Sequence, residues 1–374
     1  DSANTRVFAT LGMISAALFS DIDGDGDPDL LVAIEWGRLR VFRNDHGQFT
    51  PAEYPGLSET HSRWNGLATG DLDGDGRLDV VATSWGRNSE YRATPDNPLV
   101  LYVGFFRGGG RPDFLLAQYD PRIRDVAPLT TFDRLPAAVP GVTKRISSFA
   151  AYADATIDQV LGQVAPTATK LGATTLDHTM FLNRGDRFEA HALPAEAQLA
   201  PAFYAGIADF NGDGKEDVFL TQNFFATDLT TPRYDAGRGL LLLGDGTGGL
   251  EPMGGQRSGV MVYGEQRGAA YADFDGDGRV DLAVGENGAA TYLFHNVGAT
   301  PGLRVRIAGP PGNPSGIGTQ MRLRWGDSLG PVREARAGAG HRSPDGAVSV
   351  LGGGVRASAR RVRGPGGRGE GVLP

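Results

Sequence analysis

The chain has 374 residues, 40% of them hydrophobic, and a formal net charge of −8, so it is long enough for one large domain and a smaller one. This composition excludes a disordered acidic tail, and the acidic balance argues against a nucleic-acid-binding protein. Cysteine is absent, which excludes disulfides, thiol nucleophiles and thiolate metal sites. The 56 glycines and 23 prolines are spread between apolar runs, a pattern that predicts short strands joined by tight turns and therefore an all-β fold.

The first apolar run, VFATLGMISAALFS at residues 7–20, leads directly into an acidic loop. We interpret this run as strand, in preference to the remnant of a signal peptide. No other run approaches the roughly 18 apolar residues of a membrane-spanning helix. The sequence therefore predicts no membrane span.

The most distinctive motif follows at residues 21–29, DIDGDGDPD, and it occurs four times. The other copies are DLDGDGRLD at 71–79, DFNGDGKED at 209–217 and DFDGDGRVD at 273–281. Carboxylate or amide oxygens fall at loop positions 1, 3, 5 and 9, with glycine at positions 4 and 6, so the oxygens converge while the backbone turns sharply. Such an oxygen set suits a hard cation, and calcium fits best because it takes six to eight oxygen ligands in flexible geometry.

We therefore expect about four calcium sites, each completed by the carbonyl of position 7 and by water. The predicted ligands are Asp21, Asp23, Asp25, Asp27 and Asp29; Asp71, Asp73, Asp75, Arg77 and Asp79; Asp209, Asn211, Asp213, Lys215 and Asp217; and Asp273, Asp275, Asp277, Arg279 and Asp281. Of these, Asp27, Arg77, Lys215 and Arg279 contribute only their carbonyls. Ordinary Asp-Gly turns explain four copies with one spacing less well. An EF-hand is excluded because position 12, which needs a bidentate Glu, is apolar in every copy.

Each loop is followed by a short apolar segment rich in β-branched residues, then by a turn, a strand and a hairpin. Repeats of this kind predict the blades of a β-propeller. A worn copy, FFRGGGRPD at residues 105–113, keeps the glycines but not the acids, which predicts the turn without the metal. The long interval that follows predicts a further blade whose hairpin is MFLNRGDRF at 180–188, together with a helical insertion at about 147–165 that begins at Ser147 or Ser148.

The four loops and their strands resemble the FG-GAP or VCBS repeats of integrin-α-type β-propellers. The segment from residue 193 is similar to exported bacterial propeller proteins related to cartilage acidic protein, and residues 296–325 and 337–352 resemble the ASPIC/UnbV domain that commonly follows in those proteins. The resemblance covers roughly residues 12–352. It implies a seven-bladed propeller, bound calcium, and a secreted, periplasmic or cell-surface location.

These observations give three expected regions. Residues 1–297 would form the propeller with its helical insertion, and residues 298–352 a small ASPIC/UnbV-like β module. Residues 353–374 depart from the family pattern, because they contain several Arg and Gly residues and little that can be buried. We expect this tail to be disordered.

No linear catalytic motif accompanies the loops: the six His residues lie far apart, and no HExxH, GxSxG or P-loop pattern occurs. Trp36, Trp85, Asn223 and Asn287 recur just after the buried strands and would lie around one face, where they form a possible ligand face or, alternatively, fill strand ends by packing. We expect an exported calcium-binding module that binds or adheres to an extracellular protein or glycan, with structural calcium. The alternative is a carbohydrate-active enzyme, a polysaccharide lyase or hydrolase, that uses the central face of the propeller.

Overall fold

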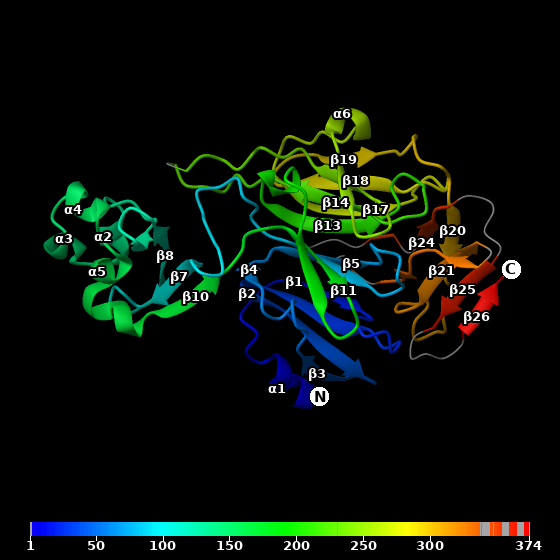
Figure 1. Ribbon diagram of the computed structural model, residues 1–374, viewed down its shortest axis with the longest axis horizontal. Coiled ribbons are helices and arrows are strands. Elements are labelled where there is room, and N and C mark those ends of the chain that lie inside the picture. Colours follow the sequence, from blue (N-terminus) through cyan, green and yellow to red (C-terminus); the bar gives the residue numbers. More distant parts are fainter. Residues whose placement is uncertain are drawn as a thin grey trace.

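The structure is a computed structural model of the chain. It describes residues 2–229, 231–325, 327–336, 338, 345–346, 348–353, 359–364 and 370–373. The predicted all-β class is confirmed: strands dominate, helices are few and short, and the strands pair in antiparallel sheets (Figure 1). Within the described residues, no helix is long and apolar enough to cross a membrane.

Four sheets carry the acidic loops, and we number them 1 to 4 in chain order. Sheet 1 contains β1 (Met13–Ser20), β2 (Asp29–Asp45), β3 (Gln48–Ala52) and β4 (His61–Arg63). Sheet 2 contains β5 (Gly66–Gly70), β6 (Asp79–Thr83), β11 (Thr179–Asn183) and β12 (Phe188–Ala192). Sheet 3 contains β13 (Ala202–Ala208), β14 (Asp217–Gln222), β15 (Leu240–Gly244) and β16 (Leu250–Met253). Sheet 4 contains β17 (Gln266–Ala272), β18 (Asp281–Glu286) and β19 (Thr291–Phe294).

The first strands of these four sheets lie next to one another. β1 contacts β5, β5 contacts β13, and β13 contacts β17. Each interface between neighbouring sheets has its own apolar core, with fully buried side chains such as Leu67 between sheets 1 and 2, Val218 between sheets 2 and 3, and Val284 between sheets 3 and 4. Because burying one such side chain contributes about 1.5–3 kcal/mol, these cores fix the sheets against one another.

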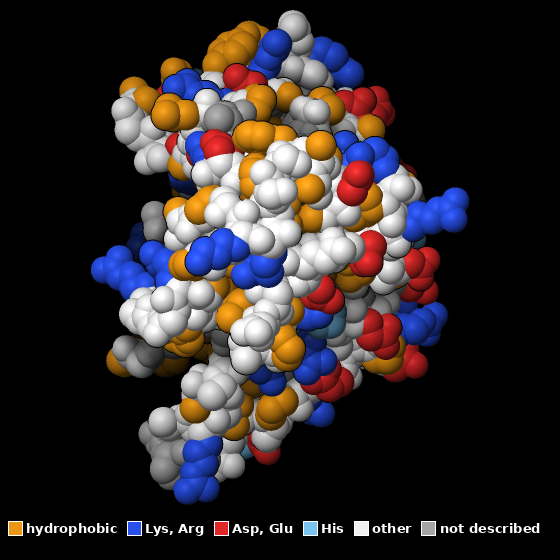
Figure 2. Space-filling model, turned by 90° about the vertical axis from the view of Figure 1, so that its left-hand side faces the viewer, with side chains coloured by type: hydrophobic (Ala, Val, Ile, Leu, Met, Phe, Trp, Pro, Cys, Tyr) orange, Lys and Arg blue, Asp and Glu red, His pale blue; other side chains and the backbone are white. Residues whose placement is uncertain are grey.

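A separate lobe is inserted between β6 and β11 of sheet 2 and lies at the left of Figure 1. Its sheet has the order β10-β7-β8-β9, and it packs against short helices around an apolar core of its own. The elements are β7 (Leu99–Gly104), β8 (Asp113–Asp120), β9 (Asp125–Pro128), α2 (Leu135–Ala138), α3 (Val142–Arg145), α4 (Phe149–Ala153), α5 (Ile157–Leu161), η1 (Gly162–Thr167) and β10 (Thr169–Ala173). Figure 2 views the molecule from this side, where hydrophobic and basic side chains are interspersed on the surface.

The lobe corrects two sequence-based expectations. The hairpin at residues 180–188 does not belong to a further blade: β11 pairs with β6, so this hairpin completes sheet 2. The helical segment consists of two short helices, because Ser148 caps α4 and Thr156 begins α5 with a reciprocal capping box to Gln159. A single helical periodicity through 147–165 could not reveal this second start.

The C-terminal residues form two further small sheets. β20 (Leu303–Arg306) pairs with β24 (Val348–Leu351), and β21 (Gln320–Trp325) pairs with β22 (Ser328–Leu329), β23 (Arg333–Glu334) and β25 (Ala359–Arg363), which also pairs with β26 (Glu370–Leu373). β25 and β26 fall in the tail for which the composition predicts disorder, and the rest of that tail is outside the described residues apart from Gly353 and Gly364. The remaining elements are α1 (Ser2–Phe8), η2 (Ala197–Leu199) and α6 (Gly255–Ser258).

Candidate metal centres

The four acidic loops occupy equivalent places in sheets 1 to 4. Each loop joins the first strand of its sheet to the second, and the last residue of the first strand pairs with the position-9 aspartate. These pairs are Ser20 with Asp29, Gly70 with Asp79, Ala208 with Asp217, and Ala272 with Asp281. The glycines at positions 4 and 6 all have positive φ, between 76° and 101°, which explains why these two positions are glycine in every loop.

The position-9 aspartate anchors each loop to its sheet. One carboxylate oxygen accepts the backbone N–H of position 2. The other accepts an N–H from the end of β2 in sheet 1, and from the third strand or just after it in sheets 2 to 4. The first set of bonds, at 2.8–3.2 Å, comes from Ile22, Leu72, Phe210 and Phe274, and the second, at 2.8–2.9 Å, from Asn44, Asn183, Gly244 and Asn296. All four aspartates are buried, so these bonds contribute directly to the stability of the turn.

The other predicted ligands direct their oxygens toward the backbone of the same loop. In three loops position 1 accepts N–H groups from the glycines at positions 4 and 6; in the first loop Asp21 accepts from Gly24 at 2.9 Å and from Gly26 at 3.0 Å. In the loop at 71–79 Asp71 accepts from Gly76. Position 3 accepts from position 5, and position 5 accepts from position 7, in all four loops. Position 7 is thereby fixed through its N–H group in every loop, at Asp27, Arg77, Lys215 and Arg279. Metal binding by the carbonyls of these residues stays a prediction.

The carboxylates of positions 1, 3 and 9 converge. In the loops at 21–29, 71–79 and 273–281, oxygens from these three positions lie within 4.8 Å of one another. In the loop at 209–217 the position-3 residue is Asn211, so the corresponding set has one amide and the buried carboxylates of Asp209 and Asp217. Asp277, at position 5, belongs to a different group with Asp275 and His295.

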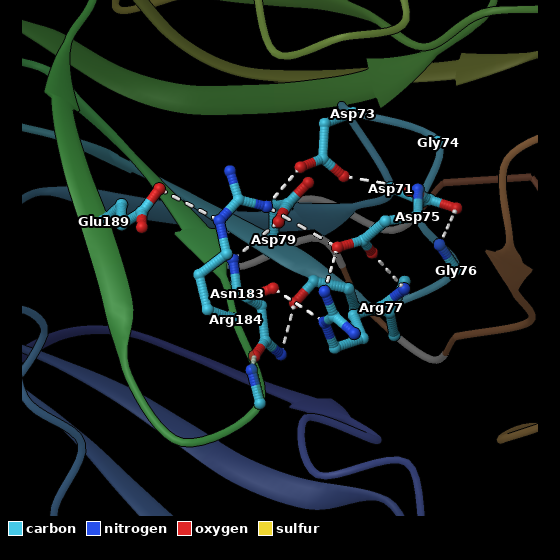
Figure 3. Close-up of polar contacts among 12 residues, drawn as sticks. Asp71, Asp73, Gly74, Asp75, Gly76, Arg77, Asp79, Asn183, Arg184 and Glu189 are labelled. Carbon is cyan, nitrogen blue, oxygen red and sulfur yellow. Dashed lines mark hydrogen bonds and ion pairs between the residues drawn. The ribbon is translucent and has the colours of Figure 1, made fainter.

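Basic side chains that sequence reasoning missed lie over three loops. The Arg43 Nε atom is 2.6 Å from Asp23, and the His295 Nε2 atom is 2.8 Å from Asp275. Figure 3 shows Arg184 pointing into the loop at 71–79, where its NH1 atom lies 2.5 Å from Asp73 and 3.5 Å from Asp75. Each of these basic residues is adjacent in sequence to an asparagine of the hairpin, Asn44, Asn183 or Asn296. This adjacency is the sequence feature from which the basic residues could have been found. A bound cation would have to replace these side chains as the charge partner.

The hairpin asparagines connect neighbouring loops. The Asn183 side-chain amide donates to the carbonyl of Leu78 in its own sheet and to that of Ile22 in the loop of sheet 1. Asn296 does the same in sheet 4, donating to the carbonyls of Val280 and, in the loop of sheet 3, Phe210. An asparagine of one sheet thus holds the position-2 carbonyl of the loop in the preceding sheet. The loops of sheets 1 and 2 are linked in this way, and so are those of sheets 3 and 4.

Burial and crowding disfavour the charged carboxylates in the absence of a cation. Desolvation, and second the neighbouring Glu334, raise the pKa of Asp21 to about 7. Desolvation also raises the pKa of Asp29, Asp79 and Asp217 to about 7 and that of Asp71 to about 6. One oxygen of Asp71, Oδ1, is buried without a hydrogen-bond partner among the described residues. Converging, buried carboxylates with such an oxygen fit a hard divalent cation.

These pKa shifts predict how stability depends on pH. Because the folded-state pKa of these carboxyls lies above the usual 3.8, the folded protein binds protons that the unfolded chain releases. The melting temperature of metal-free protein should therefore fall as the pH rises from about 4 to about 7, and saturating calcium should abolish this fall by holding the carboxylates ionised. Thermal melts of dialysed protein across this range test the expectation, and a melting temperature that rises with pH in metal-free buffer would contradict it.

The worn loop at 105–113 keeps its turn without the acids. Gly108 and Gly110 have φ of 88°, as in the acidic loops. The Arg107 guanidinium at position 3 lies 2.6 Å from Asp113 at position 9, so an internal cation already neutralises the one remaining carboxylate. This contact supports the interpretation that the turn is retained and the metal is lost.

The residues of the possible ligand face make internal contacts. Trp36 and Trp85 are 7% and 5% exposed, and the Arg63 guanidinium lies 5.0 and 3.8 Å from their ring centroids. Asn223 is fully buried and bonds to backbone groups of other loops, while Asn287 donates to Glu265 at 2.7 Å. These contacts favour the packing alternative for the two Trp and for Asn223.

The strand pattern and the repeated loops together define an all-β protein built from acidic-loop repeats. Residues 21–82 and 209–284 match the family model of the FG-GAP-like repeat, so the chain contains such repeats at these two places. No curated protein matches the chain. The matched ranges end before residue 298, and the similarity to ASPIC/UnbV and cartilage acidic proteins therefore stays a prediction.

Proposed function

We propose that the chain is an exported, calcium-stabilised protein of the β-propeller type that binds an extracellular protein or glycan. The observation that supports this most directly is the hydrogen-bond pattern that positions 3, 5 and 9 repeat in four loops, in three of which the carboxylates of positions 1, 3 and 9 converge. Calcium would be held by positions 1, 3, 5 and 9 and by the position-7 carbonyl of each loop. It would supply charge compensation and fixed coordination, so its role is structural.

The propeller assignment is supported by the adjacent first strands of sheets 1 to 4, each sheet following the same loop-and-strand order. The resemblance to integrin-α-type proteins adds the expectation of seven blades, of which the described residues supply four acidic-loop sheets. The same resemblance adds two further expectations, a location outside the cytoplasm and an ASPIC/UnbV-like module at residues 298–352.

A binding role is supported by exposed aromatic side chains on a rigid framework. Phe105, Phe114 and Phe149 of the inserted lobe are 59%, 55% and 69% exposed. Large exposed hydrophobic side chains are common at sites that bind protein or sugar surfaces. The lobe's own apolar core would hold these side chains on a fixed framework, which lowers the entropic cost of binding.

The proposal is tested by incubating calcium-loaded protein with a panel of extracellular polysaccharides and proteins. We expect retention of at least one member without cleavage, because binding requires only a preorganised surface. Retention is measured by co-sedimentation or affinity electrophoresis, and cleavage by the release of reducing or unsaturated sugar ends. A variant with Phe105, Phe114 and Phe149 replaced by Ser should lose retention while its melting temperature in calcium stays unchanged.

Cleavage of any polysaccharide would instead support the carbohydrate-active enzyme that the sequence leaves as the alternative. An equilibrium titration with calcium tests the metal assignment separately, and it should give about four sites. Failure to bind calcium would overturn the structural role of the loops whatever the binding panel shows.

A further inference from the structure

The described part of the C-terminal residues 298–352 lies against the acidic-loop end of all four sheets. In each loop at least one backbone carbonyl or carboxylate forms a hydrogen bond or an ion pair with this segment. The contacts are Gln320 Nε2 to Asp21 Oδ2 at 3.2 Å, Val332 N–H to Asp71 Oδ2 at 2.7 Å, Thr300 N–H to the Asn211 carbonyl at 3.2 Å, Gly302 N–H to the Gly278 carbonyl at 2.7 Å, and Arg304 Nε to Asp273 Oδ2 at 2.5 Å. Gly352 packs so closely on the loop of sheet 3 that an added Cβ would lie 1.6 Å from Asp209 Oδ2. The described part of this segment therefore covers the loops.

A buried ion pair anchors this cover. Glu216 stands at position 8 of its loop, where the other three loops have Pro, Leu and Val, and its carboxylate lies 2.5 Å from Arg333 Nε of β23. The side chains are 2% and 12% exposed. An unpaired buried charge destabilises the fold, so burial of either residue is favourable only when the other lies beside it.

Neighbouring residues of the cover reach the first strands of all four sheets. Glu334 accepts from Ser20 of β1, and the Arg336 guanidinium donates to the carbonyl of Thr69 in β5. Asp345 accepts from the Tyr204 hydroxyl of β13 at 2.8 Å and from the N–H of Tyr271 in β17 at 3.3 Å. The cavity that remains there is about 70 Å³, a volume with room for a few water molecules. Charged side chains of the cover thus fill the space between the four strand ends.

The cover and a loop cation would use opposite sides of the same carboxylates. At Asp21, Asp71 and Asp273 the C-terminal donor reaches Oδ2, the oxygen that also accepts the N–H of the position-6 glycine. The unpartnered buried oxygen of Asp71 is the other one, Oδ1. A cation on the Oδ1 side and a C-terminal donor on the Oδ2 side would hold the same carboxylate in one orientation, so each would preorganise this group for the other. Cation and cover therefore stabilise each other through a shared group.

We propose that the cover, residues 298–352, is an intramolecular cap on the acidic-loop face and that docking of this cap is coupled to cation loading. Calcium in the loops tightens the cap, and by reciprocity a docked cap raises the calcium affinity of the loops. This inference rests on the proposed calcium binding of the loops. It assigns to the C-terminal module a partner within the same chain, namely the charged ends of four loops.

Hydrogen exchange of the full chain tests the coupling directly. Peptides from 298–325 and 327–336 should exchange more slowly in calcium than in chelator. The inserted lobe at 99–173 is the internal control, because it has its own core and no acidic loop, and its exchange should be the same in both conditions. Equal exchange of the cap peptides with and without calcium would overturn the coupling.

Variants distinguish coupling from simple electrostatics. Arg304→Gln removes a positive charge beside Asp273, which by charge alone should strengthen calcium binding, whereas loss of a docked cap should weaken it several-fold. Arg306→Gln is the matched control, since Arg306 lies two residues further along β20 and makes no ion pair among the described residues. Calcium titration by calorimetry with Arg304→Gln equal to or tighter than Arg306→Gln would overturn the proposal.

A second variant leaves every predicted ligand in place. Glu216→Gln combined with Arg333→Met removes the buried ion pair as a pair, at similar volume, and should lower calcium affinity although position 8 is no ligand. Unchanged affinity in this double variant, with cap peptides that exchange faster, would show that docking and loading are independent and would overturn the coupling. If the wild-type chain binds no calcium, the proposed function itself fails, and this outcome is distinguishable from calcium binding without coupling.

Discussion

Removal of calcium is expected to lower the melting temperature by roughly 14 °C when all four loops are loaded at first. A site at a hundredfold excess of free calcium over its dissociation constant adds about 2.7 kcal/mol to the free energy of unfolding. With an unfolding entropy of about 2.1 cal/mol/K per residue, a chain of this length loses about 3.4 °C for each such site. Differential scanning calorimetry in chelator and in calcium measures the shift.

Magnesium provides the control for this experiment. It prefers octahedral geometry and keeps several waters, so at equal concentration it should restore much less of the melting temperature than calcium does. Identical melts in calcium and in chelator would contradict the structural role of the cation. Identical restoration by magnesium would contradict the assignment to calcium in particular.

The second large effect concerns Asp29, for which we expect a loss of stability even when calcium is absent. Replacement by Ala leaves the buried N–H of Ile22 and the partly buried N–H of Asn44 without acceptors, each at a cost of about 1–3 kcal/mol. The free energy of unfolding should therefore fall by about 4 kcal/mol in chelator, and by about a further 2.7 kcal/mol in calcium, because the position-9 ligand of this loop is lost as well. Urea unfolding curves in both conditions measure it.

Two variants of the same loop serve as comparisons. Asp23→Asn removes a ligand carboxylate and should destabilise the protein in calcium but have little effect in chelator. Asp27→Asn should have little effect in either, because position 7 offers only its carbonyl to the metal. If Asp23→Asn and Asp27→Asn destabilise the calcium-loaded protein equally, the ligand assignment is wrong.

The sequence was sufficient wherever the determining interactions are local. The nine-residue loops fix their own turns through glycines with positive φ and through aspartates that bond to backbone groups a few residues away. The apolar, β-branched residues after each loop predict the strand that follows it. These local rules predicted the all-β class, the turn at 105–113 without its acids, and the places where carboxylates converge.

What the sequence could not supply depends on contacts between distant residues. Nothing local to residues 180–188 shows that β11 pairs with β6, and interval counting therefore assigned this hairpin to a separate blade. Arg184 reaches Asp73 only because that pairing exists. Nothing in the sequence distinguishes Glu216, the eighth residue of its loop. Its ion pair depends on Arg333 of β23, which lies beside it only in the folded chain.

The inserted lobe also has a consequence for how the chain folds. Ala82 of β6 pairs with Thr179 of β11, so sheet 2 cannot close until the whole intervening segment has been brought together. For an unfolded segment this closure carries an entropic cost that grows with the logarithm of its length. A lobe that collapses early around its own core shortens the effective loop, because β7 and β10 are neighbours in one sheet and hold its two ends together. We therefore expect the lobe to fold before sheet 2, and the slowest step to be the pairing of β6 with β11.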